Sequence, residues 1–320
     1  MLETLTQKVL AGEVPSGDEL SHIASLAGAD LFQLFSAAAR IREEYRGIRV
    51  DLCSIINAKS GACSEDCSYC AQSSKSRADI PIFSLVKADS VLKKAREAKD
   101  AGVRRFCIVT SGRKAGKGEL KEIASVIGKV RGLGLLPCAT LGLLERDELS
   151  MLRESGLERY HHNLETSERF FPEICSTHTY ADKMRTIEAV KSIGLSLCSG
   201  GIFGIGESWQ DRIEMALALR ELDVDSVPIN FLIAVKGTQM EDKVPLHPFD
   251  ALKIISLYRF ALPGKEVRVC GGRRQTLGEF NSMVFMAGAD SLLTGNYLTT
   301  AGTPYDDDLR LIRQYGLEVG

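Results

Sequence analysis

The stretch Gly61-Ala-Cys-Ser-Glu-Asp-Cys-Ser-Tyr-Cys70 places three cysteines, Cys63, Cys67 and Cys70, in a C-x3-C-x2-C spacing. Thiolates this close in sequence can converge on one small metal centre, and soft sulfur ligands favour iron–sulfur clusters, zinc or copper(I). A closed structural zinc site needs four protein ligands, and no second cysteine pair follows at the required distance. The loop therefore predicts an iron–sulfur site, with a structural metal knuckle or three unrelated buried thiols as alternatives.

The number of thiols in this loop bears on what the site does. Three thiolates on a cluster of four irons leave one iron without a protein ligand, whereas four cysteines would close the cluster. An open iron can bind a small molecule because its coordination sphere is incomplete. The spacing therefore favours a catalytic site over a purely structural one.

The composition is that of a globular enzyme. The 320 residues are 44% hydrophobic and carry a net charge of −2, which gives no reason to expect nucleic acid or an anionic membrane as a partner. The first residues are polar and amphipathic, unlike a secretory signal, and no stretch approaches the roughly 18 uninterrupted apolar residues of a membrane helix. Nine cysteines in such a chain indicate metal ligands or buried thiols, so we expect a cytoplasmic protein.

Around the loop, the chain predicts an α/β fold with an N-terminal helical extension over residues 1–48. From 49 to 320, short apolar strands alternate with amphipathic helices. The strands are expected at 51–57, 105–110, 136–141, 159–164, 196–203, 226–233, 267–271 and 291–294, and the helices at 88–101, 118–132, 147–155, 180–192, 209–222, 248–261 and 279–287. Eight strands over this length match a (β/α)8 barrel of the TIM type, and the pattern alone leaves a doubly wound open sheet as the alternative.

The loop also carries a family resemblance. Its cysteine spacing, with Tyr69 just before the last cysteine, resembles the signature of radical S-adenosylmethionine enzymes. The longer run Lys59-Ser-Gly-Ala-Cys-Ser-Glu-Asp-Cys-Ser-Tyr-Cys-Ala-Gln-Ser-Ser74 resembles the biotin synthase family in particular. The resemblance implies a complete barrel and a 4Fe–4S cluster on the three loop cysteines. It also implies that S-adenosylmethionine chelates the open iron through its amine and carboxylate.

Cys107, Cys138 and Cys198 fall in the middle of three expected strands. A buried cysteine usually behaves as a small hydrophobe, but side chains at similar height in a barrel meet near its axis. By resemblance, the three thiols bind an auxiliary 2Fe–2S cluster whose fourth ligand is an arginine. Arg273 is expected in that role on the resemblance alone, because arginine is normally a protonated donor.

Polar positions on two further strands complete the expected site. His161, Asn163 and Glu165 alternate along one strand and share a face, as either a satisfied polar layer or a ligand site. The resemblance implies that Asn163 and Glu165 contact the ribose of S-adenosylmethionine, and that His161 and Asn230 face the ureido ring of the substrate. It implies that the complete set of residues binding S-adenosylmethionine is Tyr69, Asn163, Glu165, Lys183, Gly200, Ile202 and Glu207.

The activity implied by the resemblance is insertion of sulfur into dethiobiotin to form biotin. A 5′-deoxyadenosyl radical abstracts hydrogen from two saturated carbons, and the auxiliary cluster donates the sulfur. An electron donor such as flavodoxin or ferredoxin and a homodimeric assembly are also implied. Two alternatives remain open: a radical enzyme resembling those of hydrogenase maturation, and a non-catalytic iron–sulfur carrier.

Cys53 and Cys270 stand where the resembled family carries serine. Residues three apart in a strand face opposite sides, so Cys270 and Arg273 would both reach inward only if Gly271 and Gly272 formed a bulge. Two extra soft ligands favour a larger auxiliary cluster over a 2Fe–2S unit. We therefore expect Cys53 or Cys270 as a further ligand, with isosteric replacement of serine as the alternative.

Overall fold

Parallel strands pair in a closed ring, and β1 completes the ring by pairing with both β2 and β9. The computed structural model describes residues 1–300 and 302–320. Its strands are β1 (Arg49–Lys59), β2 (Arg105–Thr110), β3 (Leu136–Thr140), β4 (Arg159–His161), β5 (Ser196–Cys198), β6 (Gly201–Phe203), β7 (Ser226–Phe231), β8 (Glu266–Val269), β9 (Ser291–Leu293) and β10 (Glu318–Val319). The expected (β/α)8 barrel is thus confirmed, and the open sheet is excluded by the pairing of β1 with β9.

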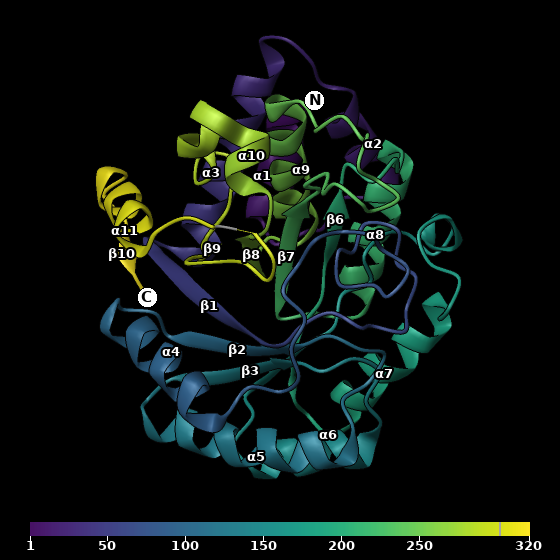
Figure 1. Cartoon of the computed structure of the whole chain (residues 1–320). Coiled ribbons are helices and arrows are strands. Elements are labelled where there is room, and N and C mark those ends of the chain that lie inside the picture. The colour runs from purple at the N-terminus through teal and green to yellow at the C-terminus, as the bar shows by residue number, and fades with distance from the viewer. Residues whose placement is uncertain (301) are drawn as a thin grey trace.

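Helices surround the ring on the outside (Figure 1). They are α1 (Leu2–Leu10), α2 (Gly17–Ser25), α3 (Asp30–Arg46), α4 (Ala88–Asp100), α5 (Lys117–Gly132), α6 (Arg146–Glu154), α7 (Tyr180–Ser192), α8 (Trp209–Glu221), α9 (Pro248–Ala261), α10 (Arg273–Leu277) and α11 (Tyr305–Gln314), with 3-10 turns at Phe171–Glu173 and Gly278–Met283. None of the helices in the described ranges is long and apolar enough to cross a membrane.

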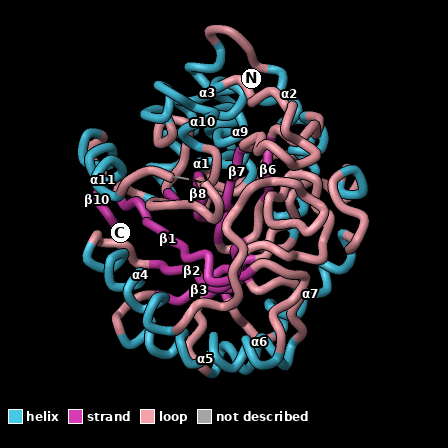
Figure 2. The backbone as a smooth tube through the Cα atoms, in the orientation of Figure 1, coloured by secondary structure: helices cyan, strands magenta, loops and turns pink. Residues whose placement is uncertain are grey.

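The N-terminal helices lie against α8 and α9, and their buried residues join the hydrophobic core of the barrel (Figure 2). Asp290, just before β9, connects the two parts. Its carboxylate accepts hydrogen bonds from Arg46 at the end of α3 (2.6 Å), from the amide of Val267 in β8 (2.8 Å) and from Arg259 in α9. The division at residues 48 and 49 remains a prediction, because core and ion pairs run across it.

Three expected elements differ clearly from those observed. The strand expected at 159–164 ends at His161, and that expected at 196–203 is interrupted at Ser199 and Gly200. The helix expected at 279–287 is replaced by a 3-10 turn at Gly278–Met283. Helices α10 and α11 and strand β10 were not expected. These deviations lie at the carboxyl ends of the strands and near the C-terminus. At the strand ends the chain lines the site instead of continuing the regular pairing.

Candidate active site and metal centre

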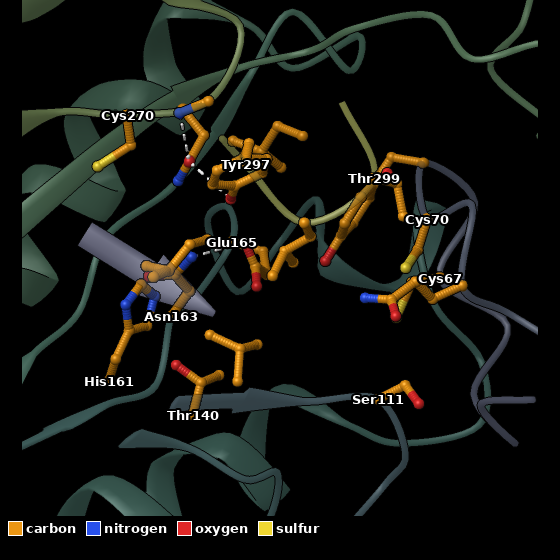
Figure 3. A pocket seen from close by; sticks show the side chains of 18 of the residues that line it. Cys67, Cys70, Ser111, Thr140, His161, Asn163, Glu165, Cys270, Tyr297 and Thr299 are labelled. Atoms are coloured by element: carbon orange, nitrogen blue, oxygen red, sulfur yellow. Dashed lines mark hydrogen bonds between the residues drawn. The ribbon is translucent and has the colours of Figure 1, made fainter. Parts of the chain in front are cut away.

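A cavity of about 340 Å³ opens at the carboxyl ends of the barrel strands and is lined by the three expected loop cysteines and by Cys107 and Cys138, whereas Cys198 is not part of its lining. This is the end of a (β/α)8 barrel where active sites form. Figure 3 shows Cys67 and Cys70 on one side of the cavity and Cys270 on the other, with Asn163 and Glu165 between them. The barrel therefore brings two separate thiol groups to a single enclosed space.

The first thiol group lies on the loop that follows β1. Cys63, Cys67 and Cys70 all line the cavity and all are free thiols. The loop is closed by backbone hydrogen bonds from Cys63 to Gln72 (3.1 Å) and from Ser74 back to Cys63 (2.8 Å). Three soft donors held on one loop fit the 4Fe–4S cluster that the spacing predicts.

The loop is fastened to a distant segment of chain, Cys175–His178. Asp66 accepts hydrogen bonds from the backbone amides of Ser176 (2.9 Å) and Thr177 (3.2 Å), and its pKa is lowered because these and neighbouring bonds outweigh its burial. Glu65 lies 2.6 Å from His178 Nδ1. Cys175 Sγ lies 3.8 Å from the Sγ of Cys67, so a fourth thiol stands beside the cluster loop.

The second thiol group lies inside the barrel. Cys107 and Cys138 are neighbours in the register of β2 and β3, and Cys53 and Cys270 join them in one buried cluster. A hydrogen bond with Cys107 and the nearby charges of His161 and two arginines outweigh burial and lower the pKa of Cys138 to about 6. Burial raises the pKa of Cys53 to about 12. The donors are soft and shielded from water, as a buried iron–sulfur cluster requires.

Cys198 lies on β5, with its sulfur 3.9 Å from His161 Nδ1 and 3.9 Å from Arg268 Nη1. Burial raises its pKa, but these positive neighbours outweigh burial and the net shift is downward. Arg268 also pairs with Glu266 and donates to Ser291 (3.0 Å). Arg268 is therefore the arginine whose guanidinium contacts Cys198.

Arg273, which was expected to be the arginine ligand, lies elsewhere. Its guanidinium binds both oxygens of Asp308 (2.7 and 2.9 Å) and the hydroxyl of Thr303 (3.0 Å). The expected bulge does not carry it inward, because Gly272 adopts a φ of 76° and turns the chain out of β8 into α10. The assignment of Arg273 as a ligand is therefore corrected: Cys270 faces the cavity and Arg273 does not.

The polar positions after β4 do face the cavity. His161, Asn163 and Glu165 all line it, and Asn163 Nδ2 donates to Glu165 Oε2 over 3.2 Å. Glu165 has a φ of 74°, a left-handed conformation that non-glycine residues rarely adopt. The amide of Ile202 donates to its carbonyl (2.9 Å) and holds it there. Such strain often marks a side chain that must point at a ligand.

Asn230 lines the cavity from β7, and its amide group is held on both sides. Its Oδ1 accepts from the backbone of Gly271 (3.1 Å) and from the hydroxyl of Tyr297 (3.1 Å), and its Nδ2 donates to the carbonyl of Gly201 (3.1 Å). A Cβ at Gly271 would come within 2.9 Å of the Tyr297 ring, so this glycine permits the contact. Tyr297 is a cavity residue that sequence reasoning missed.

The remaining expected S-adenosylmethionine positions divide into two groups. Tyr69, Lys183 and Ile202 line the cavity. Glu207 does not, since its carboxylate accepts from the backbone amides of residues 204–206 and pairs with Arg212 at 2.7 Å. Gly200 is tightly packed inside the protein, where a Cβ would come within 2.2 Å of the Pro228 carbonyl. These two residues shape the site without facing it.

The cavity also suits a polar organic ligand. Thr110 and Thr300 line it, and the hydroxyl oxygen of each is buried with no hydrogen-bond partner among the described residues. Buried polar atoms normally have partners, so these two hydroxyls are available to a ligand. Together with Asn163 and Glu165, they fit a molecule that carries a ribose, an amine and a carboxylate.

Comparisons with known proteins identify the family of the chain. The family model described as the radical SAM superfamily matches residues 58–219, and that of the biotin and thiamin synthesis associated domain matches residues 228–318. Biotin synthase of Thermodesulfovibrio yellowstonii is 56% identical over 289 residues, covering 90% of this chain and 91% of that protein. Biotin synthase of Geobacter metallireducens is 46% identical over 321 residues, covering 100% and 98% respectively.

Among solved structures, methylornithine synthase is similar with a TM-score of 0.86, over 99% of this chain and 97% of that one. At 21% sequence identity this likeness shows the shared fold alone. The family rests instead on the two family models and on relatives that match over nearly the whole chain. The chain belongs to the biotin synthase family of radical S-adenosylmethionine enzymes.

Proposed function

We propose that this chain converts dethiobiotin into biotin by removing hydrogen from two saturated carbons and bridging them with sulfur. One observation carries the proposal: a single cavity is lined by the three loop thiols and by the strand thiols Cys107 and Cys138. A substrate in that cavity lies between a site for S-adenosylmethionine and a site for a sulfur donor. When bound, the 4Fe–4S cluster and S-adenosylmethionine supply a 5′-deoxyadenosyl radical, and the auxiliary cluster supplies the sulfur.

The side chains of the cavity position the two small molecules. Asn163 and Glu165 hold the ribose, and Lys183 pairs with the methionine carboxylate as a point charge. Asn230 faces the ureido ring, and its hydrogen bond with Tyr297 fixes its orientation. His161 Nδ1 lies 3.9 Å from the sulfur of Cys198. His161 therefore contacts the auxiliary site in addition to facing the substrate. The cavity keeps the reacting groups close together.

The auxiliary cluster binds to Cys107, Cys138 and Cys198. Its arginine ligand is Arg268, in place of the expected Arg273. Arg268 is supported by its 3.9 Å contact with Cys198 and by its burial among the thiols. Cys53 and Cys270 extend the donor set, since both lie in the same buried cluster as Cys107 and Cys138. We propose a larger iron–sulfur cluster that uses one of these two thiols as a further ligand.

The proposed reaction also requires an electron donor and a reducing compartment. It needs a one-electron donor such as flavodoxin or ferredoxin, and we propose a homodimer in the cytoplasm. A reducing compartment fits the nine cysteines of the chain, which are all free thiols.

The proposal is tested by anaerobic reconstitution with iron and sulfide, followed by addition of reductant, S-adenosylmethionine and dethiobiotin. Mass spectrometry is expected to detect biotin, with release of 5′-deoxyadenosine. Cys198→Ala is the matched variant, and it is expected to release 5′-deoxyadenosine while losing biotin formation. Release of 5′-deoxyadenosine without biotin in the parent would contradict the substrate, and no release at all would favour a non-catalytic carrier.

A further inference from the structure

Cys175 and His178 lie beside the cluster loop but have no part in the proposed reaction. The Cys175 sulfur is 3.8 Å from the Cys67 sulfur, 3.2 Å from His178 Nδ1 and 4.0 Å from His178 Nε2. Ligand atoms of all three residues lie within 4.8 Å of one another. Among the described residues no other set of three or more such side chains is as close, and the three loop thiols themselves do not form one.

These distances match a single metal ion. Zinc binds thiolate sulfur at about 2.3 Å, which places two sulfurs of a tetrahedral site about 3.8 Å apart. The separation of Cys67 and Cys175 has this value. A four-iron cluster needs its ligands farther apart, because the cluster itself lies between them. The geometry therefore suits a mononuclear ion on Cys67, Cys175 and His178.

The surroundings of His178 support the same conclusion. Glu65 Oε2 lies 2.6 Å from Nδ1, the ring nitrogen that is also nearer to Cys175 Sγ (3.2 Å, against 4.0 Å for Nε2). A carboxylate behind the imidazole is the usual arrangement around a metal-binding histidine. Glu65 is itself held by the hydroxyl of Thr177 (2.9 Å). If Nδ1 keeps its hydrogen bond to Glu65, the ring must turn to bring Nε2 toward Cys175 when an ion binds.

Cys175 is positioned just as firmly. Asp66 accepts from Cys175 Sγ (3.3 Å) and from the amides of the next two residues, which fixes the turn that carries this thiol. Cys67 and His178 line the cavity, so an ion can reach two of the three ligands from the cavity, and the sulfur of Cys175 lies 3.8 Å behind that of Cys67. A tetrahedral ion held by three protein ligands keeps one position for water.

We propose that, in the cluster-free protein, Cys67, Cys175 and His178 bind one divalent metal ion that prefers thiolate and imidazole ligands. Zn²⁺ and Fe²⁺ share this chemistry. Binding releases the thiol protons to solvent. Because Cys67 also belongs to the cluster loop, this ion and the 4Fe–4S cluster exclude each other. The site thereby controls whether the loop is open for cluster assembly, a role separate from biotin formation.

The first test measures Zn²⁺ binding to anaerobic, cluster-free protein by equilibrium dialysis and elemental analysis. Because the strand thiols can also bind Zn²⁺, the proposed site is counted by difference. Cys175→Ser and His178→Ala should each bind one Zn²⁺ fewer per chain than the parent, and Glu65→Gln should bind that ion about 10- to 100-fold more weakly. Cys63→Ala is the matched control, since it removes a loop thiol but leaves the three proposed ligands, and it should bind as the parent does. Circular dichroism checks that each variant is folded.

The opposite pattern overturns the proposal. If Cys175→Ser and His178→Ala bind Zn²⁺ as tightly as the parent while Cys63→Ala does not, the ion sits on the loop thiols alone. Cobalt(II) gives an independent readout, because its sulfur charge-transfer absorption should fall in Cys175→Ser and persist in Cys63→Ala. Neither measurement depends on S-adenosylmethionine or dethiobiotin, so their outcome is separate from the test of biotin formation.

A second experiment distinguishes the two ions. The parent and Cys175→Ser are loaded with one equivalent of Zn²⁺ or Fe²⁺, and cluster absorbance is followed after addition of iron and sulfide. Zn²⁺ should slow assembly in the parent and have little effect on Cys175→Ser. Fe²⁺ should not slow it in either protein, because bound iron can enter the cluster. Equal slowing by Zn²⁺ in both proteins would contradict a role for Cys175.

Discussion

Arg268 and Arg273 are five residues apart, and a single backbone turn separates their environments. Arg268 extends from β8 to the thiols of the barrel, where burial alone would lower its pKa. Glu266 and three neighbouring cysteines outweigh that effect and raise it, so the guanidinium stays charged. Arg273 begins α10 and pairs with Asp308. One arginine therefore lies among the strand thiols, and the other fastens the C-terminal segment to the barrel.

Exchanging each arginine for lysine should separate these two roles. Arg268→Lys is expected to change the Mössbauer and electron paramagnetic resonance signals of the auxiliary cluster, because the planar guanidinium is lost beside Cys198. Arg273→Lys should leave those signals unchanged and lower the free energy of unfolding by about 1–3 kcal/mol, since Asp308 loses a bidentate partner. Altered cluster signals in Arg273→Lys alone would restore the earlier assignment.

The extra thiols Cys53 and Cys270 allow a second test at single residues. If the auxiliary cluster is larger than 2Fe–2S, iron and sulfide analysis of the parent should exceed the sum for one 4Fe–4S and one 2Fe–2S cluster. Cys53→Ser or Cys270→Ser should then lower the iron content or change the Mössbauer spectrum. A 2Fe–2S spectrum in the parent, unchanged in both variants, would show that the thiols only replace serine.

Much of the site could be predicted from single residues, and the exceptions have physical causes. The loop and strand cysteines and the positions Asn163 and Glu165 were identified because their spacing is visible in the sequence. Arg268 could also have been found, because residues two apart in a strand share a face and Cys270 was expected to point inward. Cys175 and His178 could not, since their contacts with the cluster loop span 108 and 113 residues.

At the scale of elements, helices with clear caps were predicted most accurately. The bounds of α7 and α9 agree with expectation, and a capping box at Thr179 and Asp182 and a proline after His247 explain why. The strand ends at the cavity were predicted poorly. Glu165, Ser199 and Gly200 lie outside the paired strands and shape the site, and a hydrophobic pattern alone does not predict such interruptions.

The N-terminal end of helix α8 is hydrogen-bonded to the loop that follows Glu165. The carboxylate of Asp211 accepts hydrogen bonds from Ser208 N (2.8 Å) at the start of the helix, and from Ser167 Oγ (2.6 Å) and Arg169 (2.6 Å) on the loop that follows Glu165. Burial raises the pKa of Asp211, but these bonds outweigh burial and lower it. The helix start thus holds the loop that carries Glu165.

Asp211→Asn should therefore destabilise the protein by about 1–3 kcal/mol at pH 7. A lowered folded-state pKa means that the Asp211 contribution is complete above the ordinary value of about 3.9 and is lost as pH falls through the folded value. The difference between parent and variant in urea unfolding should accordingly shrink below about pH 4. Asp182→Asn changes the same position of the more exposed α7 cap and should lower the free energy of unfolding by less. An equal loss in the two variants would contradict a special role of Asp211.

At the scale of the whole molecule, one buried carboxylate connects the N-terminal helices to the barrel. Asp290 binds Arg46 of α3, Arg259 of α9 and the backbone of β8. Arg259 is fully buried, and its other hydrogen bonds go to backbone carbonyls, which carry no full charge. Removing the charge of Asp290 would leave a guanidinium in the core without its counterion.

Asp290→Asn is therefore expected to destabilise the fold by about 3–5 kcal/mol, the usual cost of leaving a buried charge unpaired. The urea unfolding midpoint should fall accordingly. Asp51→Asn is the matched control, because its ion pairs with Arg46 (4.0 Å) and Arg104 (3.8 Å) are longer and partly exposed, and it should cost less than about 1 kcal/mol. Similar midpoints for the two variants would show that Asp290 is not the connection described.

The pairing of β1 with β9 has a consequence for synthesis on the ribosome. Asp51 pairs with Ser291, 240 residues later. At about 5–20 residues per second, roughly 12 to 48 seconds separate the emergence of the two strands. Throughout that time β1 has an unpaired edge, which is a template for aggregation. A nascent chain of this protein is thus a natural client for chaperones until its last strand emerges.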